Sequence, residues 1–195
     1  MADSSMNVGD RIRKLRLKRE LSIEDVANKT AISAITLAGI EDQSISPPLG
    51  TMILLAKALQ VPLGDIFGDH ADSPYCIVRS DDQNSVSRFG STGGRSGYNY
   101  KSLGRQKQNR QMEPFLVTLT PTESPLAEPN QHEGEEILFV LEGQVKVRLA
   151  DHTDILNPGD SIYYDANLPH VVACHGEQPA KIFAVIYAEK DMLIL

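Results

Sequence analysis

The sequence predicts an all-α domain followed by an all-β domain. Residues 8–67 carry apolar side chains at helical spacing, whereas from Tyr98 onward short apolar runs alternate with turn residues. The residues between these two parts are rich in Gly, Ser and Asp, which is typical of a linker or a mobile loop. We therefore expect a helical domain over residues 1–68, a linker over 69–97 with possible short strands, and a β domain over 98–195.

The composition allows a packed core but gives no strongly basic surface. The chain has 195 residues, of which 41% are hydrophobic, and its net charge is -7. Up to Gly68 eight basic residues balance eight acidic ones, whereas eleven basic and eighteen acidic residues follow. The whole surface is therefore unsuited to coating DNA or an anionic membrane, although a local basic stripe would be enough for a nucleic-acid footprint.

Three further features point to a cytoplasmic protein. The two cysteines, Cys76 and Cys174, do not predict a disulfide framework. No apolar run is long enough to span a bilayer. The first ten residues, MADSSMNVGD, lack the apolar core of a secretory signal.

The helical domain is predicted from four amphipathic segments and a short closing helix. In the first, VGDRIRKLRLKREL, the apolar face holds Val8, Ile12 and Leu15. Ser22 and Asp25 have the spacing of a capping box at the start of IEDVANKT. Ser33 is a candidate N-cap of AITLAGIED. The fourth segment is LGTMILLAKALQV, and PLGDIFG closes the unit.

The β domain is predicted from short runs separated by Pro, Gly, Asn and Asp. These runs are PFLVTLT, EEILFVL, QVKVRLA, HTDILN, SIYYD, HVVACH and KIFAVIYA. Val145 and Val147 alternate with Lys146 and Arg148, which indicates a half-buried strand. Regular spacing of such strands favours a sandwich or small barrel. In the linker, YCIVRS is a candidate short strand.

The second and third helical segments have the form of a helix-turn-helix. Ala27, Ile32 and Leu37 have the spacing of residues that lock two short helices together across a tight turn. Over roughly the first 68 residues the chain resembles the XRE class of helix-turn-helix regulators, whose domain is lambda-repressor-like. The resemblance implies that the third helix enters the major groove of operator DNA.

The reading helix departs from the usual pattern. Ile23 replaces the glutamine that the class usually carries early in its second helix. The candidate DNA-binding residues are Ser33, Ala34, Ile35, Thr36, Ala38, Gln43 and Ser44. Alanine and isoleucine can contact thymine methyl groups but make no bidentate hydrogen bonds to purines. Glu41 and Asp42 would repel phosphates if they faced them, so a helical bundle that no longer binds DNA is the alternative.

A candidate metal site lies in the β domain. His132 and Glu136 are four residues apart, so they fall on one face if the segment is a strand. His170, after a turn and a strand of its own, would complete a two-histidine, one-carboxylate set for Fe, Mn, Ni or Zn. Each residue alone also has an ordinary interpretation, as a loop histidine, a solvated glutamate or a core histidine.

These stretches resemble the two motifs of the cupin superfamily. His132, Glu136 and Gly143 fit the spacing of the first motif, with Asn130 in place of its first histidine. His170 fits the second motif, with Cys174 in place of its asparagine. The resemblance implies a double-stranded β-helix, that is, a jelly-roll barrel.

The cupin resemblance also implies a ligand site inside the barrel. His132, Glu136 and His170 would converge as metal ligands, and Asn130 could add a weak fourth oxygen. Many cupins attached to helix-turn-helix domains hold an organic effector without a metal. The candidate effector-binding residues are Tyr98, Tyr100, Asn130 and Cys174.

Two functions follow from these resemblances. The first is an XRE-cupin transcriptional regulator, which is not an enzyme. It would bind operator DNA as a homodimer and sense a small molecule in the barrel, where a divalent metal is also possible. The alternative is a non-haem iron oxygenase similar to 2-hydroxypropylphosphonate epoxidase, in which the helical domain covers the substrate. Glu20 falls near the position where such an enzyme carries a lysine, and a carboxylate there would repel a phosphonate.

Overall fold

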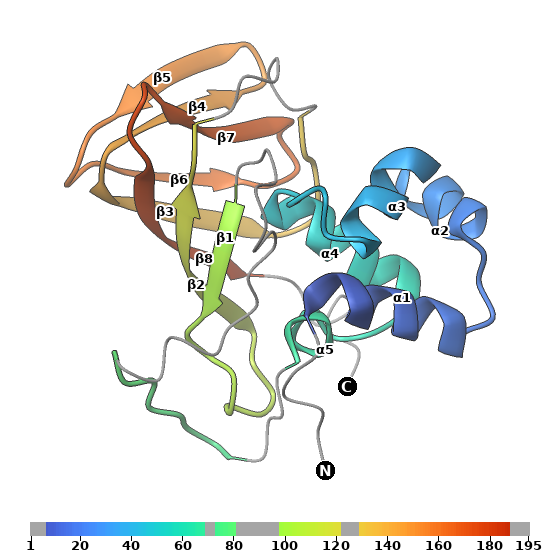
Figure 1. Ribbon diagram of the computed structural model, residues 1–195. Coiled ribbons are helices and arrows are strands. Elements are labelled where there is room, and N and C mark those ends of the chain that lie inside the picture. The colour runs from blue at the N-terminus through green and yellow to red at the C-terminus, as the bar shows by residue number, and fades with distance from the viewer. Residues whose placement is uncertain (1–6, 69–72, 81–97, 122–128, 188–195) are drawn as a thin grey trace.

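In the computed structural model, a helical bundle packs against one side of an antiparallel β fold (Figure 1). The structure describes residues 7–68, 73–80, 98–121 and 129–187. The helices are α1 (Val8–Lys18), α2 (Ile23–Thr30), α3 (Ala34–Glu41), α4 (Leu49–Leu59) and α5 (Leu63–Phe67). Within the described ranges no helix is both long and apolar enough to cross a membrane.

Side-chain caps define the start of the predicted helix-turn-helix. The hydroxyl of Ser22 accepts a hydrogen bond from the Asp25 amide at 3.0 Å, and the Asp25 carboxylate accepts one from the Ser22 amide at 2.8 Å, so the capping box is confirmed. Ser33 caps α3 through the amide of Thr36 at 3.0 Å. Between α2 and α3, Ala31 adopts a left-handed conformation with φ of 56°.

The helices share an apolar core and one buried ion pair. The core includes Val8, Ile12, Val26, Leu37, Ile40, Met52, Leu55 and Leu59. Arg16 of α1 makes a bidentate contact with Glu41 of α3, with N–O distances of 2.6 and 2.8 Å. The Glu41 carboxylate is therefore turned into the bundle and not toward the outer surface. This pair ties the first helix to the end of the reading helix.

The β domain consists of two antiparallel sheets. Its strands are β1 (Tyr98–Ser102), β2 (Met112–Leu119), β3 (Glu135–Glu142), β4 (Gln144–Leu149), β5 (His152–Leu156), β6 (Ser161–Asp165), β7 (His170–His175) and β8 (Ala180–Tyr187). They form a five-stranded sheet in the order β1-β2-β8-β3-β6 and a three-stranded sheet in the order β5-β4-β7. This architecture agrees with the predicted jelly-roll.

Alternation along the strands separates an inner face from an outer face. In β3, Glu136, Leu138 and Val140 are buried, whereas Ile137 and Phe139 are exposed. Glu136 occupies the same set of alternate positions in β3 as the core residues Leu138 and Val140, so its carboxylate points into the barrel interior.

The two domains share a continuous apolar core. Phe67 at the end of α5 packs against Tyr100 of β1 and Phe115 of β2, with ring centroids 6.1 and 5.0 Å away. All three rings are almost fully buried. The helical bundle is therefore packed onto the barrel by aromatic contacts of the kind found inside a single domain.

The predicted short strand at YCIVRS is wrong. Residues 75–80 form no strand, and nearby only Ser73 makes an isolated bridge, to Lys107. Tyr75 and Ile77 are exposed, so the apolar side chains of this run have no sheet face on which to pack. Most of the predicted linker, residues 81–97, lies outside the described residues.

Candidate metal and effector site

The structure brings His132, Glu136 and His170 together inside the barrel. Glu136 points inward from β3, and His170 is the first residue of β7 in the other sheet. Two reciprocal backbone hydrogen bonds of 2.8 Å join His170 to Asn130, which brings the segment of His132 beside β7. The potential ligand atoms of the three residues lie within 4.8 Å of one another, and all three side chains are buried.

Hydrogen bonds fix the orientation of each side chain in this cluster. Nε2 of His132 lies 2.8 Å from Oε1 of Glu136, and Nε2 of His170 lies 4.0 Å from the same oxygen. The hydroxyl of Tyr164 donates to the other carboxylate oxygen of Glu136 at 2.5 Å. Tyr164 was not predicted from the sequence, although its alternation with the exposed Tyr163 in β6 places it on the inner face.

Both imidazoles are held through their Nδ1 atoms. Nδ1 of His132 lies 3.0 Å from the carbonyl oxygen of Glu133, and Nδ1 of His170 lies 2.8 Å from that of Leu168. A carbonyl accepts a hydrogen bond, so these contacts assign a proton to Nδ1 and direct Nε2 of each ring toward Glu136. Metal-binding histidines are oriented by the same kind of contact.

Charge in the cluster is strongly coupled. Burial acts to lower the pKa of His132, but the hydrogen bond and the charge of Glu136 outweigh it and raise this pKa above its usual value. Burial acts to raise the pKa of Glu136, but its hydrogen bond to His132 and the nearby imidazoles lower it overall. Burial lowers the pKa of His170. Glu136 therefore favours the protonated form of His132, and His132 favours the ionised form of Glu136, whereas burial favours the neutral form of His170.

The donor set fits a divalent metal ion. Two histidine nitrogens and a carboxylate are a donor set that divalent transition metals use, and these three residues would hold such an ion. Donors about 2.1 Å from a metal are separated by roughly 3 Å, so the ligand atoms, which lie from 2.8 Å to at most 4.8 Å apart, would have to draw together around the ion. The cluster could thus hold a metal ion in place of the proton on His132.

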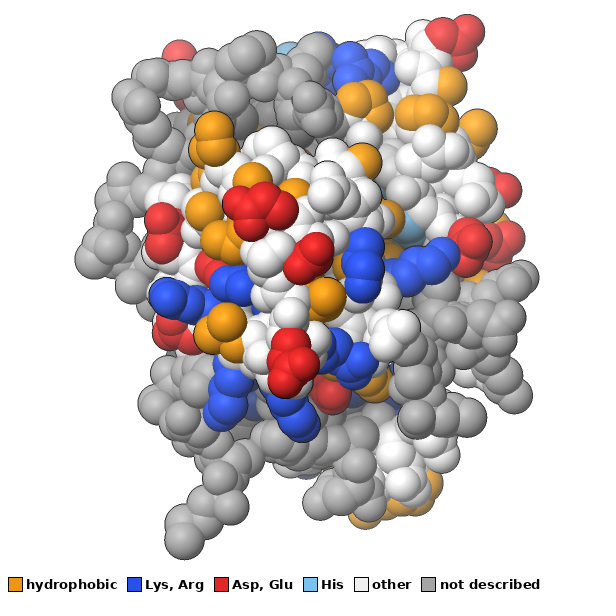
Figure 2. All heavy atoms as spheres, turned by 90° about the vertical axis from the view of Figure 1, so that its right-hand side faces the viewer, with side chains coloured by type: hydrophobic (Ala, Val, Ile, Leu, Met, Phe, Trp, Pro, Cys, Tyr) orange, Lys and Arg blue, Asp and Glu red, His pale blue; other side chains and the backbone are white. Residues whose placement is uncertain are grey.

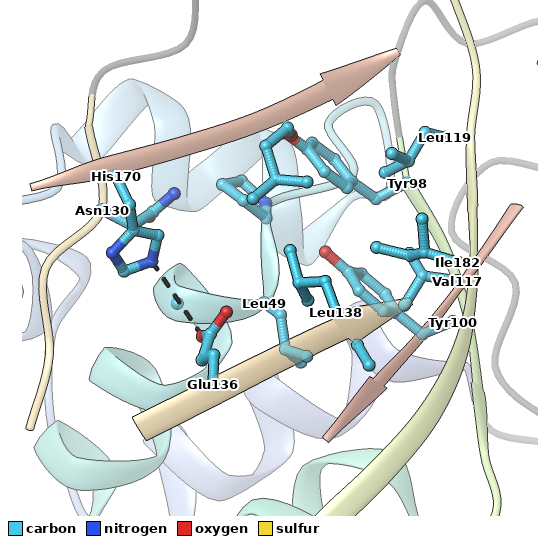
Figure 3. Close-up of a pocket in the computed structure, with 14 residues that line it drawn as sticks. Leu49, Tyr98, Tyr100, Val117, Leu119, Asn130, Glu136, Leu138, His170 and Ile182 are labelled. Carbon is cyan, nitrogen blue, oxygen red and sulfur yellow. Dashed lines mark hydrogen bonds and ion pairs between the residues drawn. The ribbon is translucent and has the colours of Figure 1, made fainter. Parts of the chain in front are cut away.

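A pocket extends from this cluster into the barrel (Figure 3). Glu136, His170 and Asn130 lie at one end, and Tyr98, Leu119 and Ile182 lie at the other. The pocket space is about 410 Å³, part of it open to solvent. The remaining walls are apolar and include Val117, Leu138, Val172 and Ala184. No lysine or arginine is among the lining residues that the structure describes.

The predicted effector-binding residues have different surroundings. Asn130, Tyr98 and Tyr100 line the pocket. The two tyrosine rings are stacked, with centroids 6.0 Å apart, and burial raises the pKa of Tyr98 to about 12. Cys174 is not among the lining residues, and its thiol donates to the carbonyl of Gln178 at 3.0 Å. It lies four residues, about 13 Å, along β7 from His170.

The tyrosine hydroxyls already have backbone partners. Tyr98 donates to the carbonyl of Val172 at 2.7 Å, and Tyr100 donates to the carbonyl of Pro47 at 2.9 Å. These two residues therefore offer a ligand the faces and edges of their rings. The pocket also includes Pro48, Leu49 and Gly50 from the helical domain, and no pattern in the sequence indicated that this domain lines it.

The outer surface of the helix-turn-helix carries mixed charge. Figure 2 shows Lys and Arg side chains on this side of the molecule, interspersed with Asp and Glu and with apolar side chains. On α3, Ile35 is 84% exposed. The hydroxyls of Ser33 and Thr36 bond each other at 2.7 Å, and that of Ser44 bonds the carbonyl of Gly39 at 3.3 Å. Ala34, Ala38 and Gln43 are partly buried.

Comparisons with known proteins agree with this two-domain architecture. Residues 12–66 match the helix-turn-helix family model, and residues 115–186 match the cupin domain model. The HTH-type transcriptional regulator PuuR of Escherichia coli (strain K12) is 25% identical over 172 residues, which cover 87% of this chain and 89% of that regulator. The (S)-2-hydroxypropylphosphonic acid epoxidase of Streptomyces wedmorensis is 32% identical over 94 residues, covering 45% of this chain and 48% of the enzyme.

A solved structure supports the same arrangement of domains. The crystal structure of an HTH_3 family transcriptional regulator from Vibrio cholerae aligns with a TM-score of 0.61 and 22% identity, covering 92% of this chain and 94% of that one. A helix-turn-helix domain followed by a cupin domain is thus the class that the fold defines. The chain carries an XRE-type helix-turn-helix domain and a C-terminal cupin domain, and it is similar to HTH-type transcriptional regulators over most of its length.

Proposed function

We propose that this regulator binds operator DNA through α3 and that a small molecule in the cupin pocket controls the binding. The observation that carries the proposal is a buried polar cluster at the end of an apolar pocket, in the same chain as the helix-turn-helix. Regulators match this chain over most of their length, which supports a binding function over a catalytic one.

The pocket suggests the chemical class of the effector. A molecule with an apolar body would pack against Val117, Leu119 and Ile182, and a single polar end would reach Glu136 and His170. A divalent metal, such as Fe, Mn, Ni or Zn, would be held by His132, Glu136 and His170. When bound, it would act as a Lewis acid that fixes the polar end of the effector.

DNA contact is assigned to the exposed N-terminal half of α3. Ile35 projects from the helix and can contact a thymine methyl group, while Ser33 marks the helix N-terminus, whose amides favour a phosphate. In a dimer the two reading helices would enter successive major grooves about 34 Å apart.

We place the dimer contact on the outer face of β3. Ile137, Phe139 and Leu141 are 40–43% exposed there, beside Tyr163 on β6. Together these exposed side chains form an apolar patch of the kind found at the centre of a protein–protein interface. A second copy of this chain fits the face because two reading helices are needed at a two-fold operator.

Sedimentation equilibrium at micromolar concentrations tests this dimer contact. We expect a dimer that Phe139→Lys converts to a monomer. Ile155→Lys, at an exposed apolar position on β5 of the other sheet, is the matched control and should remain dimeric. A wild-type monomer, or a Phe139→Lys dimer, would show that β3 is not the contact.

The function itself is tested by DNA binding. The DNA upstream of the gene that encodes this chain is titrated with protein at fixed 150 mM salt, against a scrambled duplex of the same length. We expect a preference of at least a hundredfold for the upstream DNA. Equal affinity for both duplexes at this salt concentration would rule out the regulator.

The oxygenase alternative has less support from this pocket. The described lining residues provide no cationic side chain to balance a phosphonate, and Glu20 lies exposed at the end of α1, outside the pocket. Oxygen consumption with Fe(II) and 2-hydroxypropylphosphonate distinguishes the two functions. We expect no consumption above that of the Glu136→Gln variant.

A further inference from the structure

We propose that α4 of the helical domain is part of the effector site, so that the DNA-binding domain touches the ligand directly. The proposal rests on the function proposed above and adds the route by which occupancy of the pocket reaches the reading helix. It begins from the lining of the pocket, where Pro48, Leu49 and Gly50 at the start of α4 line the same pocket as Glu136 and His170; Figure 3 labels Leu49 among them.

The contact between α4 and the barrel leaves no free space at Gly50. A Cβ atom at this position would lie 2.8 Å from Cβ of Asn130 and 3.1 Å from Cδ2 of His132. These distances are below ordinary carbon–carbon contact, so glycine allows an approach that no other residue permits here. The next residue, Thr51, donates to the side-chain oxygen of Asn130 at 3.1 Å.

The loop before α4 is bonded to the opposite wall of the same pocket. Ser46 donates its hydroxyl to the carbonyl of Tyr98, and Tyr100 donates to the carbonyl of Pro47 at 2.9 Å. Both tyrosine rings line the pocket. A ligand that shifts either tyrosine ring would therefore pull on the loop of Ser46 and Pro47. A ligand that touches Leu49 would act on the same place, because Leu49 directly follows this loop.

Helix α4 is packed into the helix-turn-helix and cannot move alone. Met52, Leu55 and Leu59 are fully buried in the core shared with Val26 of α2 and Leu37 of α3. A displacement at the start of α4 is consequently carried to the reading helix by close-packed side chains.

The docked position of α4 corresponds to the DNA-binding state. With α4 against the barrel, α3 exposes Ile35, and the placement of the helical domain relative to the barrel is fixed. In a dimer, helical domains that are docked on their barrels hold the two reading helices at one spacing, so both can bind the operator together. Helical domains released from the barrels no longer hold that spacing, and operator affinity falls. A ligand that takes the space bordered by Leu49 and Gly50 competes with docking and lowers operator affinity.

A reversible cross-link tests this coupling without knowledge of the effector. Gly50→Cys and Asn130→Cys are combined in a Cys76→Ser, Cys174→Ser background. A disulfide needs a Cβ separation of about 3.8 Å, so oxidation locks α4 close to its docked position, while the reduced side chains crowd it away. We expect the oxidised form to bind the upstream DNA at least tenfold more tightly than the reduced form.

The outcomes separate this inference from the proposed function. If the oxidised and reduced forms bind the upstream DNA with equal affinity while the wild type binds it specifically, the coupling through α4 is wrong and the proposed regulator function stands. Lack of specific binding by the wild type would instead refute the proposed function.

Hydrogen exchange of residues 49–55 examines the docking even without DNA. Gly50→Ala should speed exchange of these amides at least tenfold relative to Gly104→Ala. At Gly104 the same added methyl would lie 3.0 Å from Cδ of the flexible Arg110 side chain and 3.4 Å from Cδ of Pro114, so the crowding there is milder. Identical exchange in the two variants would show that α4 is not held against the barrel.

Discussion

His132 and Glu136, four residues apart, meet at 2.8 Å between Nε2 and Oε1 in the buried interior of the barrel. The contact is an ion pair while His132 keeps its proton, and the same atoms become metal ligands when the proton leaves. Two other side chains lie against the Glu136 carboxylate: the Tyr164 hydroxyl donates to Oε2 at 2.5 Å, and Nε2 of His170 lies 4.0 Å from Oε1. Metal binding here should therefore depend on the charge of Glu136 and on the proton of His132.

Glu136→Gln should abolish retention of a divalent metal. The amide keeps the size of the side chain but removes the anionic donor between the two imidazoles. Metal content of the purified protein, measured by elemental analysis after dialysis against Mn, Fe, Ni or Zn, should fall from about one ion per chain to background. Glu135→Gln, at the neighbouring outward position of β3, is the control and should retain its metal. Unchanged metal content in Glu136→Gln would refute the site.

Metal affinity should decrease as the pH falls through the raised pKa of His132. Below this pKa the imidazole carries a proton that the metal must displace, so affinity should drop about tenfold per pH unit. Above it the proton is absent and affinity should level off. Isothermal titration with Ni²⁺ between pH 5.5 and 8 measures the slope, and the exposed His152→Gln variant should reproduce it. A flat profile would show that no proton is displaced from His132.

The sequence was sufficient to predict the fold class, because its signals are local. The Ser22–Asp25 capping box and the alternation of Val145 and Val147 with charged residues depend only on neighbours along the chain. The parity of Glu136 likewise placed it on the inner face of β3. The structure also brings His132 and His170 to that carboxylate, while their role as ligands remains a prediction.

Features that depend on distant contacts could not be predicted in the same way. The wall formed by Leu49 and Gly50 arises from docking between domains, which leaves no periodic pattern. Cys174 shares the parity of His170 but lies too far along β7 to line the pocket, because parity fixes a face and not a depth. The charge of Glu41 gave no indication that Arg16 would bury it.

Loss of one partner of the Arg16–Glu41 pair should destabilise the helical domain strongly. Arg16→Met leaves a buried carboxylate without its bidentate partner, so the free energy of unfolding should fall by about 3–5 kcal/mol. The double variant Arg16→Met, Glu41→Leu removes both charges and should recover most of this loss. Urea denaturation monitored by circular dichroism compares them. Equal destabilisation of the single and double variants would mean that packing, not the uncompensated charge, dominates.

Ala31→Gly should stabilise the turn between α2 and α3. Ala31 has φ of 56°, a left-handed conformation that costs a residue with a side chain about 1 kcal/mol relative to glycine. Its side chain is exposed, so removal of the methyl group loses little packing. Ala58→Gly, inside α4, should have the opposite effect, with a loss of about 1 kcal/mol. Thermal unfolding of both variants reports the sign, and a lower Tm for Ala31→Gly would contradict the prediction.

Ile35→Ala should weaken specific DNA binding while leaving the fold unchanged. The side chain is 84% exposed on α3, so it contributes little to the core, but at a thymine methyl group its loss should reduce affinity for the upstream DNA about tenfold, or ~1.4 kcal/mol. Affinity for scrambled DNA should not change, because backbone contacts are unaffected. Leu17→Ala, at a 57% exposed position on α1, is the matched control. Fluorescence anisotropy on both duplexes measures the difference, and an equal loss on the two would mean that Ile35 does not contact base edges.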